Sequence, residues 1–438
     1  MKRFVLALGL MLGATVAHAE IDIQEVQSPK GFKAWLVEDH AIPFVALELR
    51  FKGGASLDEV GKRGASNLMI GLLEEGAGDL DARGFAEQSE AIAAQFGYSI
   101  SDDAVQISAK YLTEKKDESI ALLRASLNDP TFDQASVDRV RQQILTSLRS
   151  DKTDPDQIAR NAFSAQVFGD HPYGSDYAGT VDSVQALTRD DVVTAWRNAL
   201  AQDRAYVAAA GDITAEELGE VMDLLLSDLP ETGAPLPERV EVETTARVTV
   251  LPFETPQSVA LFGHRGLPRD HPDFFAAYVM NTIFGEGGFE SRLMTEVREK
   301  RGLTYGVYSY LLPKDHAELL IGQVASANDR ISEAVDVIRD EWAKLAENGV
   351  TQAELTQAQT YLTGAYALRF DGNGPIAKIL VGMQMDGLTP QYINTRNDRI
   401  NAVTLEDIKR VAAEIIKPDE LTFVVVGDPK GLDGGIIH

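Results

Sequence analysis

The sequence predicts an α/β protein of the α+β type, with two copies of one domain, each a mixed, mainly antiparallel sheet covered by helices on one side. Three observations support this fold class. The chain has 438 residues, more than one ordinary hydrophobic core accommodates. Strand-like and helix-like segments alternate in pairs. A motif near Thr188 reappears near Thr404, beyond a proline-rich stretch.

The first half shows these alternating elements most clearly. Runs rich in β-branched and aromatic residues predict strands over residues 34–37, 45–51, 98–100 and 104–112. Apolar residues at helical spacing predict helices over residues 64–75, 117–127 and 136–148. Strand pairs interleaved with helix pairs favour one sheet per half, with the helices packed against it.

The repeat aligns Thr188 with Thr404, and at the same offset of 216 residues Gly211 meets Gly427. Near the front of each half, Val45 resembles Val259 at an offset of 214. This agreement predicts a duplicated domain of a little over 200 residues. Chance similarity between short helix–strand units is the alternative explanation.

Residues 229–239 carry three prolines and a glycine, which oppose helix and sheet and therefore predict an extended linker. The expected domains are residues 20–228 and 240–433, followed by a tail at 434–438.

The first nineteen residues predict a secretory signal peptide. Lys2 and Arg3 precede an apolar run over residues 4–16, and Ala17-His18-Ala19 supplies small residues before a cleavage site at Glu20. The run is shorter than the ~20 residues that span a bilayer, although an uncleaved anchor is the alternative. A periplasmic protein without stable membrane insertion is therefore expected.

The composition excludes several classes of function. The net charge is −26, and so acidic a chain is repelled by nucleic acids. The chain has no cysteine, which excludes disulfides, thiolate nucleophiles and Cys-based metal sites.

The histidines do not form a self-contained zinc helix, because such a site needs two imidazoles four residues apart. Beyond the signal peptide they are His40, His171, His264, His271, His316 and His438. His171 lies in a turn, where a single histidine favours a structural role. We therefore predict no metal ligand set in this chain.

One segment carries the strongest candidate chemistry. Residues 290–301 predict a helix, Gly302 is a natural stop, and residues 303–311 predict a strand. Arg298 and Tyr305 can then meet in one cleft, where a guanidinium and a phenol suit a carbonyl or carboxylate. The alternative is a helix-capping Arg and a half-buried sheet Tyr.

Residues 291–293 together with Arg298, Gly302 and Tyr305 closely resemble the C-terminal signature of the pitrilysin/insulinase family of zinc metallopeptidases. Residues 171–174 match that family's mid-domain turn. The resemblance covers essentially the whole mature chain and implies a clamshell of two α/β halves. In the family one half holds zinc through a His-x-x-Glu-His helix and a distal glutamate. The other half contributes an Arg and a Tyr that contact the substrate peptide.

The sequence departs from that family at the zinc helix. Asn67 stands at the first His position, Ile70 at the catalytic Glu and Gly71 at the second His. The distal glutamate falls near Asp138 in a loose alignment. Ile70 cannot activate water or carry a proton, so this chain is predicted to bind no zinc and to be inactive alone.

The resemblance therefore implies the Arg–Tyr subunit of a heteromeric peptidase, whose homologous partner bears the zinc and whose substrates are peptides. Arg298 and Tyr305 would bind substrate and stabilise the transition state. A peptide-binding or scaffolding pseudopeptidase is the non-enzymatic alternative. A third possibility is a peptidase with an unforeseen metal site in this chain.

Overall fold

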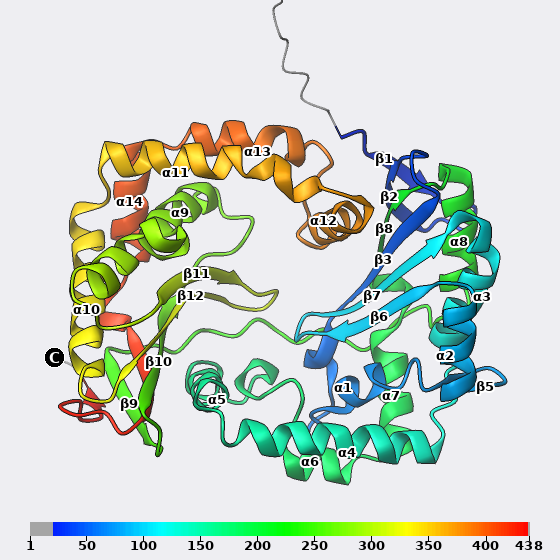
Figure 1. Cartoon of the computed structure of the whole chain (residues 1–438), viewed down its shortest axis with the longest axis horizontal. Helices are drawn as coiled ribbons and strands as arrows, with labels where there is room; N and C mark the ends of the chain where they lie inside the picture. The colour runs from blue at the N-terminus through cyan, green and yellow to red at the C-terminus, as the bar shows by residue number, and fades with distance from the viewer. Residues whose placement is uncertain (1–20, 437–438) are drawn as a thin grey trace, which may run out of the picture.

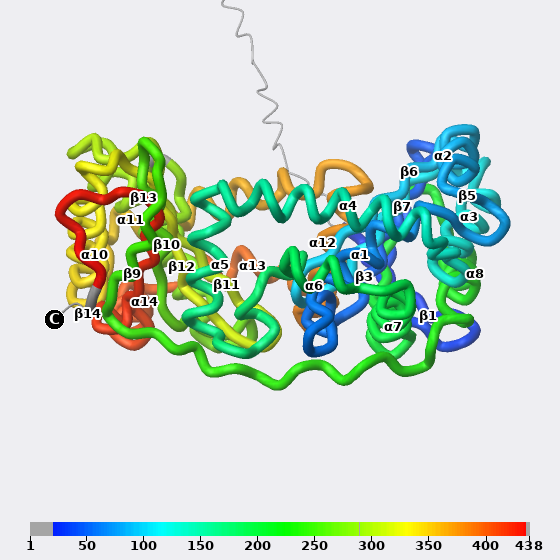
Figure 2. Tube along the Cα trace, turned by 90° about the horizontal axis from the view of Figure 1, so that it is seen from below, coloured from blue at the N-terminus to red at the C-terminus, as the bar shows by residue number. Residues whose placement is uncertain are grey.

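The structure is a computed structural model that describes residues 21–436, and it contains two six-stranded sheets, one from each half of the chain (Figure 1). The predicted fold class is confirmed. The predicted signal peptide, residues 1–19, lies outside the described residues. The predicted linker, residues 229–239, runs along one side of the molecule between the two halves (Figure 2).

Five strands of each sheet share one topology, and the outermost strands β1 (Gln24–Gln27) and β14 (Gly435–Ile436) take the same place but come from opposite ends of the described chain. The first has the order β1 (Gln24–Gln27), β2 (Lys33–Glu38), β8 (Ala205–Gly211), β3 (Phe44–Lys52), β7 (Ala104–Leu112) and β6 (Gln95–Ile100). The second, read in reverse, has the order β14 (Gly435–Ile436), β9 (Arg247–Pro252), β13 (Thr422–Gly427), β10 (Gln257–Arg265), β12 (Glu318–Ala327) and β11 (Val307–Pro313). Among the strands that the structure describes, only β2–β8 and β9–β13 are parallel pairs. The shared order confirms the duplication, and it places β6 and β11 at equivalent sheet edges.

Helices cover one face of each sheet and enclose its main core. On the first sheet they are α1 (Ala65–Ile70), α2 (Ala82–Ala91), α3 (Lys116–Asn128), α4 (Gln134–Asp151), α6 (Val181–Ala186), α7 (Arg189–Ala199) and α8 (Ala215–Leu226). On the second they are α9 (Phe274–Asn281), α10 (Ile331–Asn348), α11 (Gln352–Gly364), α13 (Tyr392–Asn401) and α14 (Leu405–Ile415). Threonine caps with reciprocal bonds begin α7 at Thr188 and α14 at Thr404, so the repeated motif is a repeated helix start.

The two halves exchange one helix each. Helix α5 (Pro155–Phe168) packs its Phe163 against Val424 of the second sheet. Helix α12 (Asn373–Met385) packs its Leu380 against Ala208 of the first sheet, and it lies between the sheets in Figure 1. The helices of each half cover one side of its sheet, as predicted, and a helix from the other half covers the opposite side, which the sequence did not indicate. Both faces of β13 are buried, because alternate residues point to α5 and to the opposite core.

His264 on β10 is fully buried and has a defined tautomer. Its Nδ1 lies 2.7 Å from the carbonyl oxygen of Arg265, which can only accept, so Nδ1 carries the proton. The indole nitrogen of Trp342 donates to Nε2 at 2.8 Å. Burial lowers the pKa of His264 to about 4. Both ring nitrogens of His264 therefore make hydrogen bonds within the core, so neither is available to bind a metal ion.

We expect acid to destabilise the protein through His264. Between pH 6.5 and pH 4 the unfolded chain binds a proton on this ring that the folded chain excludes. Stability is therefore lost as pH falls, by about 3 kcal/mol across this window. Urea unfolding at pH 7 and pH 4 should show a smaller loss in His264→Gln, which does not titrate. Equal losses in the two proteins would contradict this assignment.

Among residues 21–436, no helix combines the length and the apolar character needed to cross a membrane.

Candidate functional site

The expected zinc helix is short. Helix α1 begins after Gly64 and ends at Ile70, so the predicted helix over residues 64–75 is wrong beyond residue 70. Tight i→i+3 bonds take over, as in the bond from the Leu73 amide to the Ile70 carbonyl. The chain then turns at Gly76, whose φ is +139°. Residue 71, the second His position of the family's motif, therefore lies past the end of the helix.

Apolar packing fills the positions of the zinc motif. Ile70 is 5% exposed and belongs to the first core. A Cβ atom added to Gly71 would lie 3.0 Å from Cγ1 of Val140 on α4, so any side chain at that position requires Val140 to shift by a few tenths of an ångström. Asn67 is half-buried. These side chains do not fit a zinc ion, and we derive no hydrolytic step through them.

Asp138 does not complete a ligand set either. It lies on the exposed side of α4, where it accepts hydrogen bonds from Arg141 at 2.7 Å and from Gln134 at 2.9 Å. On the same helix it is Val140 that approaches Gly71 of the expected zinc helix. The structure thus separates Asp138 from the positions of the degenerate motif.

The segment that carries Arg298 is π-helical. Residues Met294–Glu299 form i→i+5 turns, as in the bond of 3.0 Å from the Lys300 amide to the Thr295 carbonyl. The prediction of one regular helix over residues 290–301 is therefore wrong in its hydrogen bonding. π-Helical turns are uncommon and are frequent at functional sites. Arg298 is half-buried on this segment.

Gly302 ends the segment as predicted, with φ of +60°, and its amide donates to the Arg298 carbonyl at 2.8 Å. The strand that follows begins at Val307, not at residue 303. Tyr305 therefore lies in the connection, held by Thr304, whose hydroxyl donates to the carbonyl of Ala325 at 2.6 Å and accepts from the amide of Gly306 at 3.0 Å. Tyr305 is 88% exposed, so the alternative of a half-buried sheet tyrosine is wrong.

Two further tyrosines extend the exposed aromatic surface. Tyr308 and Tyr310 lie on one face of the edge strand β11, and their rings stack at 6.2 Å. Burial raises the pKa of both phenols, so they remain neutral hydrogen-bond donors near pH 7. The segment from Arg298 to Tyr310 thus presents phenols beside a half-buried arginine.

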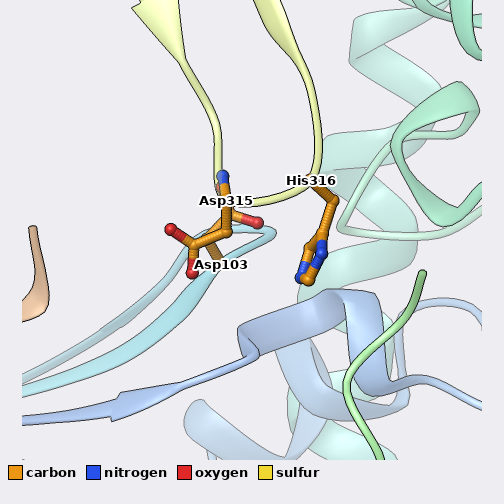
Figure 3. A group of neighbouring side chains, drawn as sticks. All are labelled: Asp103, Asp315 and His316. Carbon is orange, nitrogen blue, oxygen red and sulfur yellow. The ribbon is translucent and has the colours of Figure 1, made fainter. Parts of the chain in front are cut away.

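A polar cluster that the sequence did not indicate lies where the two halves meet. Asp103 in the β6–β7 turn lies beside Asp315 and His316 in the equivalent β11–β12 turn, with ligand atoms within 4.8 Å of one another (Figure 3). The Tyr173 hydroxyl donates to Asp103 and accepts from the His316 amide at 3.2 Å. The turn motifs at Asp103 and Tyr173 were visible in the sequence, but their proximity depends on the tertiary fold.

Two carboxylates and an imidazole are possible metal ligands, but lysines already supply positive charge here. The Lys52 ammonium lies 3.3 Å from Asp315, and Lys314 donates to neighbouring Asp102 at 2.8 Å. Burial lowers the pKa of His316 and keeps its ring neutral. The ion pairs Lys52–Asp315 and Lys314–Asp102 each connect the two halves of the chain. We call this contact, together with Asp103, Tyr173 and His316, the joint between the halves.

We expect Tyr173→Phe to weaken this joint. Tyr173 is 2% exposed, so the variant leaves the Asp103 carboxylate and the His316 amide with one buried partner fewer. The free energy of unfolding should fall by about 1–3 kcal/mol. Urea unfolding measures it, with Tyr177→Phe as a control, because Tyr177 is 44% exposed. A cost equal to that of the control would contradict a role for the hydroxyl at the joint.

Comparisons with known proteins agree with this architecture. Residues 33–181 match the family described as Insulinase (Peptidase family M16), and residues 186–362 match the Peptidase M16 inactive domain. The chain is 27% identical over 436 residues to the non-peptidase homolog YmxG of Helicobacter pylori, covering 98% of this chain and 99% of that protein. It is 27% identical over 384 residues to the uncharacterized zinc protease SCO5738 of Streptomyces coelicolor, covering 86% and 83%.

A solved structure of a peptidase M16 inactive domain from Pseudomonas fluorescens is similar over the whole fold. Its TM-score is 0.86 at 26% identity, and the match covers 95% of this chain and 100% of that chain. The predicted family resemblance is therefore confirmed. The chain belongs to the insulinase, or M16, peptidase family, as a pseudopeptidase member with Asn67, Ile70 and Gly71 at the zinc-motif positions.

Proposed function

We propose that this chain is the non-zinc subunit of a heteromeric M16 peptidase, which binds the peptide substrate and stabilises the transition state for a homologous, zinc-bearing partner. One observation carries the proposal. The zinc-motif positions hold Asn67, a buried Ile70 and Gly71, whereas Tyr305 is 88% exposed next to the π-helical segment that carries Arg298. The chain lacks the zinc ligands of the first half but keeps the Arg298–Tyr305 pair of the second half. This combination supports an active site whose zinc ligands come from another subunit.

In this function the side chains of the second half act on the peptide. The Tyr305 phenol donates a hydrogen bond to the carbonyl oxygen of the scissile bond as negative charge develops on it. Arg298 binds a backbone carbonyl or a carboxylate of the peptide through its planar guanidinium. Tyr308 and Tyr310 offer aromatic contacts to the peptide from the same side of β11.

The partner supplies the rest of the chemistry. The chain itself offers no fitting zinc ligands at the degenerate motif, so zinc is expected in the partner subunit. The predicted signal peptide supports a periplasmic location for this chain, and a partner that binds it is expected in the same compartment. A homologous partner is expected to carry an intact His-x-x-Glu-His helix.

Recovery of the complex tests this proposal. The tagged mature chain is purified from native periplasm, and co-purifying proteins are identified. Peptide hydrolysis is then measured for this chain, for the partner and for their mixture. We expect turnover only from the mixture, and its loss on chelation. Full activity of the partner alone would contradict a catalytic contribution from this chain.

A second candidate function is a peptide-binding or scaffolding pseudopeptidase without a catalytic role. The relative named a non-peptidase homolog, which matches 98% of this chain, favours it. The same hydrolysis measurements separate the two functions, because a scaffold binds peptides or partners without raising the rate.

A further inference from the structure

A cationic cavity of about 780 Å³ lies between the first sheet and helix α12. Strands β3 and β7 form one wall, and α12 with neighbouring residues of the second half forms the other. Its charged lining comprises six basic residues, Arg50, Lys110, Arg269, Arg369, Lys378 and Arg396. Only two acidic residues, Glu48 and Asp386, line the same cavity.

This excess of positive charge runs against the composition of the protein, in which Asp and Glu number 67 and Lys and Arg 41. Acidic partners are therefore abundant, yet four of these basic side chains lack an ion pair or a side-chain hydrogen bond within residues 21–436. They are Arg50, Lys110, Arg369 and Lys378. The Nε atom of Arg50 is also buried without a hydrogen-bond partner among the described residues. Such a concentration of unpaired cations favours an anionic ligand.

Helix α12 is shaped to admit these cations. Gly374, Lys378 and Gly382 follow one another at intervals of four residues and so lie along one helix face. A Cβ atom at Gly374 would lie 3.3 Å from Nζ of Lys110, and one at Gly382 would lie 3.3 Å from Nη1 of Arg50. The two glycines therefore leave room for basic side chains of the first sheet against the helix.

The acidic lining does not neutralise the cavity. Glu48 is within electrostatic range of Arg50, Lys378 and Lys110, and Asp386 lies 3.8 Å from Arg269, so two carboxylates face six basic residues. Because the single carboxylate of Glu48 lies among Arg50, Lys110 and Lys378, the cavity keeps a net positive charge that a ligand can neutralise.

We propose that this cavity binds an acidic segment of a peptide, with at least two carboxylates paired to Arg50, Lys110 and Lys378. The peptide identity rests on the proposed function. It also fits the lining, because Tyr366, Tyr392 and other apolar surface lie beside the cations and can contact a peptide's side chains. A net charge of −26 repels acidic polymers, so selective binding of one requires this local field.

Binding of labelled peptides to the isolated mature chain tests the inference at physiological ionic strength. Fluorescence anisotropy compares a glutamate-rich peptide with glutamine-substituted and lysine-substituted versions of the same length. We expect the acidic peptide to bind at least tenfold more tightly than either. In the double variant Lys110→Gln/Lys378→Gln its affinity should fall about tenfold, since each exposed charge pair contributes up to about 1 kcal/mol.

The matched control is Lys33→Gln/Lys152→Gln, which removes two exposed lysines away from the cavity and should leave binding unchanged. Tighter binding of the lysine peptide, or equal binding by both double variants, would overturn the inference. In a second experiment, binding of inorganic tripolyphosphate is measured in place of the peptide, to distinguish a site for phosphate groups from a site for carboxylates. If it binds with the same lysine dependence while the acidic peptide does not bind, the peptide assignment is wrong. None of these results depends on hydrolysis or on a partner, so they are independent of failure of the proposed catalytic role.

Discussion

Replacing Tyr305 by phenylalanine is expected to slow peptide hydrolysis by the reconstituted complex about 10²–10³-fold, the usual cost of losing one donor to a developing oxyanion. The phenol is 88% exposed, so the substitution removes a hydroxyl without disturbing a core. The kcat/KM value and the binding of the two subunits are measured on the same preparations. Activity should fall while complex formation and the unfolding midpoint stay unchanged.

The control for Tyr305 is Tyr361→Phe. Tyr361 is 59% exposed on α11, outside the proposed peptide surface, so its loss should not affect the rate. Arg298→Ala should slow the reaction as well, with Arg298→Lys restoring the charge but not the planar geometry. Wild-type rates from both Tyr305→Phe and Arg298→Ala would refute the assignment of this pair.

Introducing a carboxylate at Ile70 is expected to have the largest effect on stability. Ile70 is 5% exposed within the first core, so Ile70→Glu buries an acid without a designed partner. The free energy of unfolding should fall by about 3–5 kcal/mol. Urea unfolding followed by circular dichroism measures this loss. Restoring the family's motif with Asn67→His, Ile70→Glu and Gly71→His should therefore destabilise the chain and not produce a zinc enzyme.

The matched control is Ile70→Leu, which keeps the volume and should cost less than about 1.5 kcal/mol. A glutamate variant as stable as the leucine variant would show that residue 70 faces an open cleft. That result would contradict the description of a zinc position closed by apolar packing.

The sequence predicted the elements that local patterns determine. The strands around residues 45–51 and 104–112, the helices α3 and α4, and the threonine-capped repeat at Thr188 and Thr404 follow from periodicity and capping residues. The stop at Gly302 follows from its freedom to adopt positive φ. The degenerate zinc motif is a matter of residue identity, so the amino-acid sequence alone reveals it.

Features that depend on distant contacts were not predictable in this way. The exchange of α5 and α12 covers the second face of each sheet, and only the continuous apolar run Phe423–Val426 hinted at it. π-Helical turns have the same apolar pattern as a regular helix over one or two turns. The joint at Asp103 and the cationic cavity assemble residues separated by more than 200 positions.

The most direct test of the central claim is the metal content and peptidase activity of the purified, isolated mature chain after incubation with zinc. We expect well under one zinc ion per chain and no hydrolysis above the blank, because Asn67, Ile70 and Gly71 supply neither two imidazoles nor a general base. One zinc ion per chain, together with chelator-sensitive hydrolysis in the absence of any partner, would contradict it.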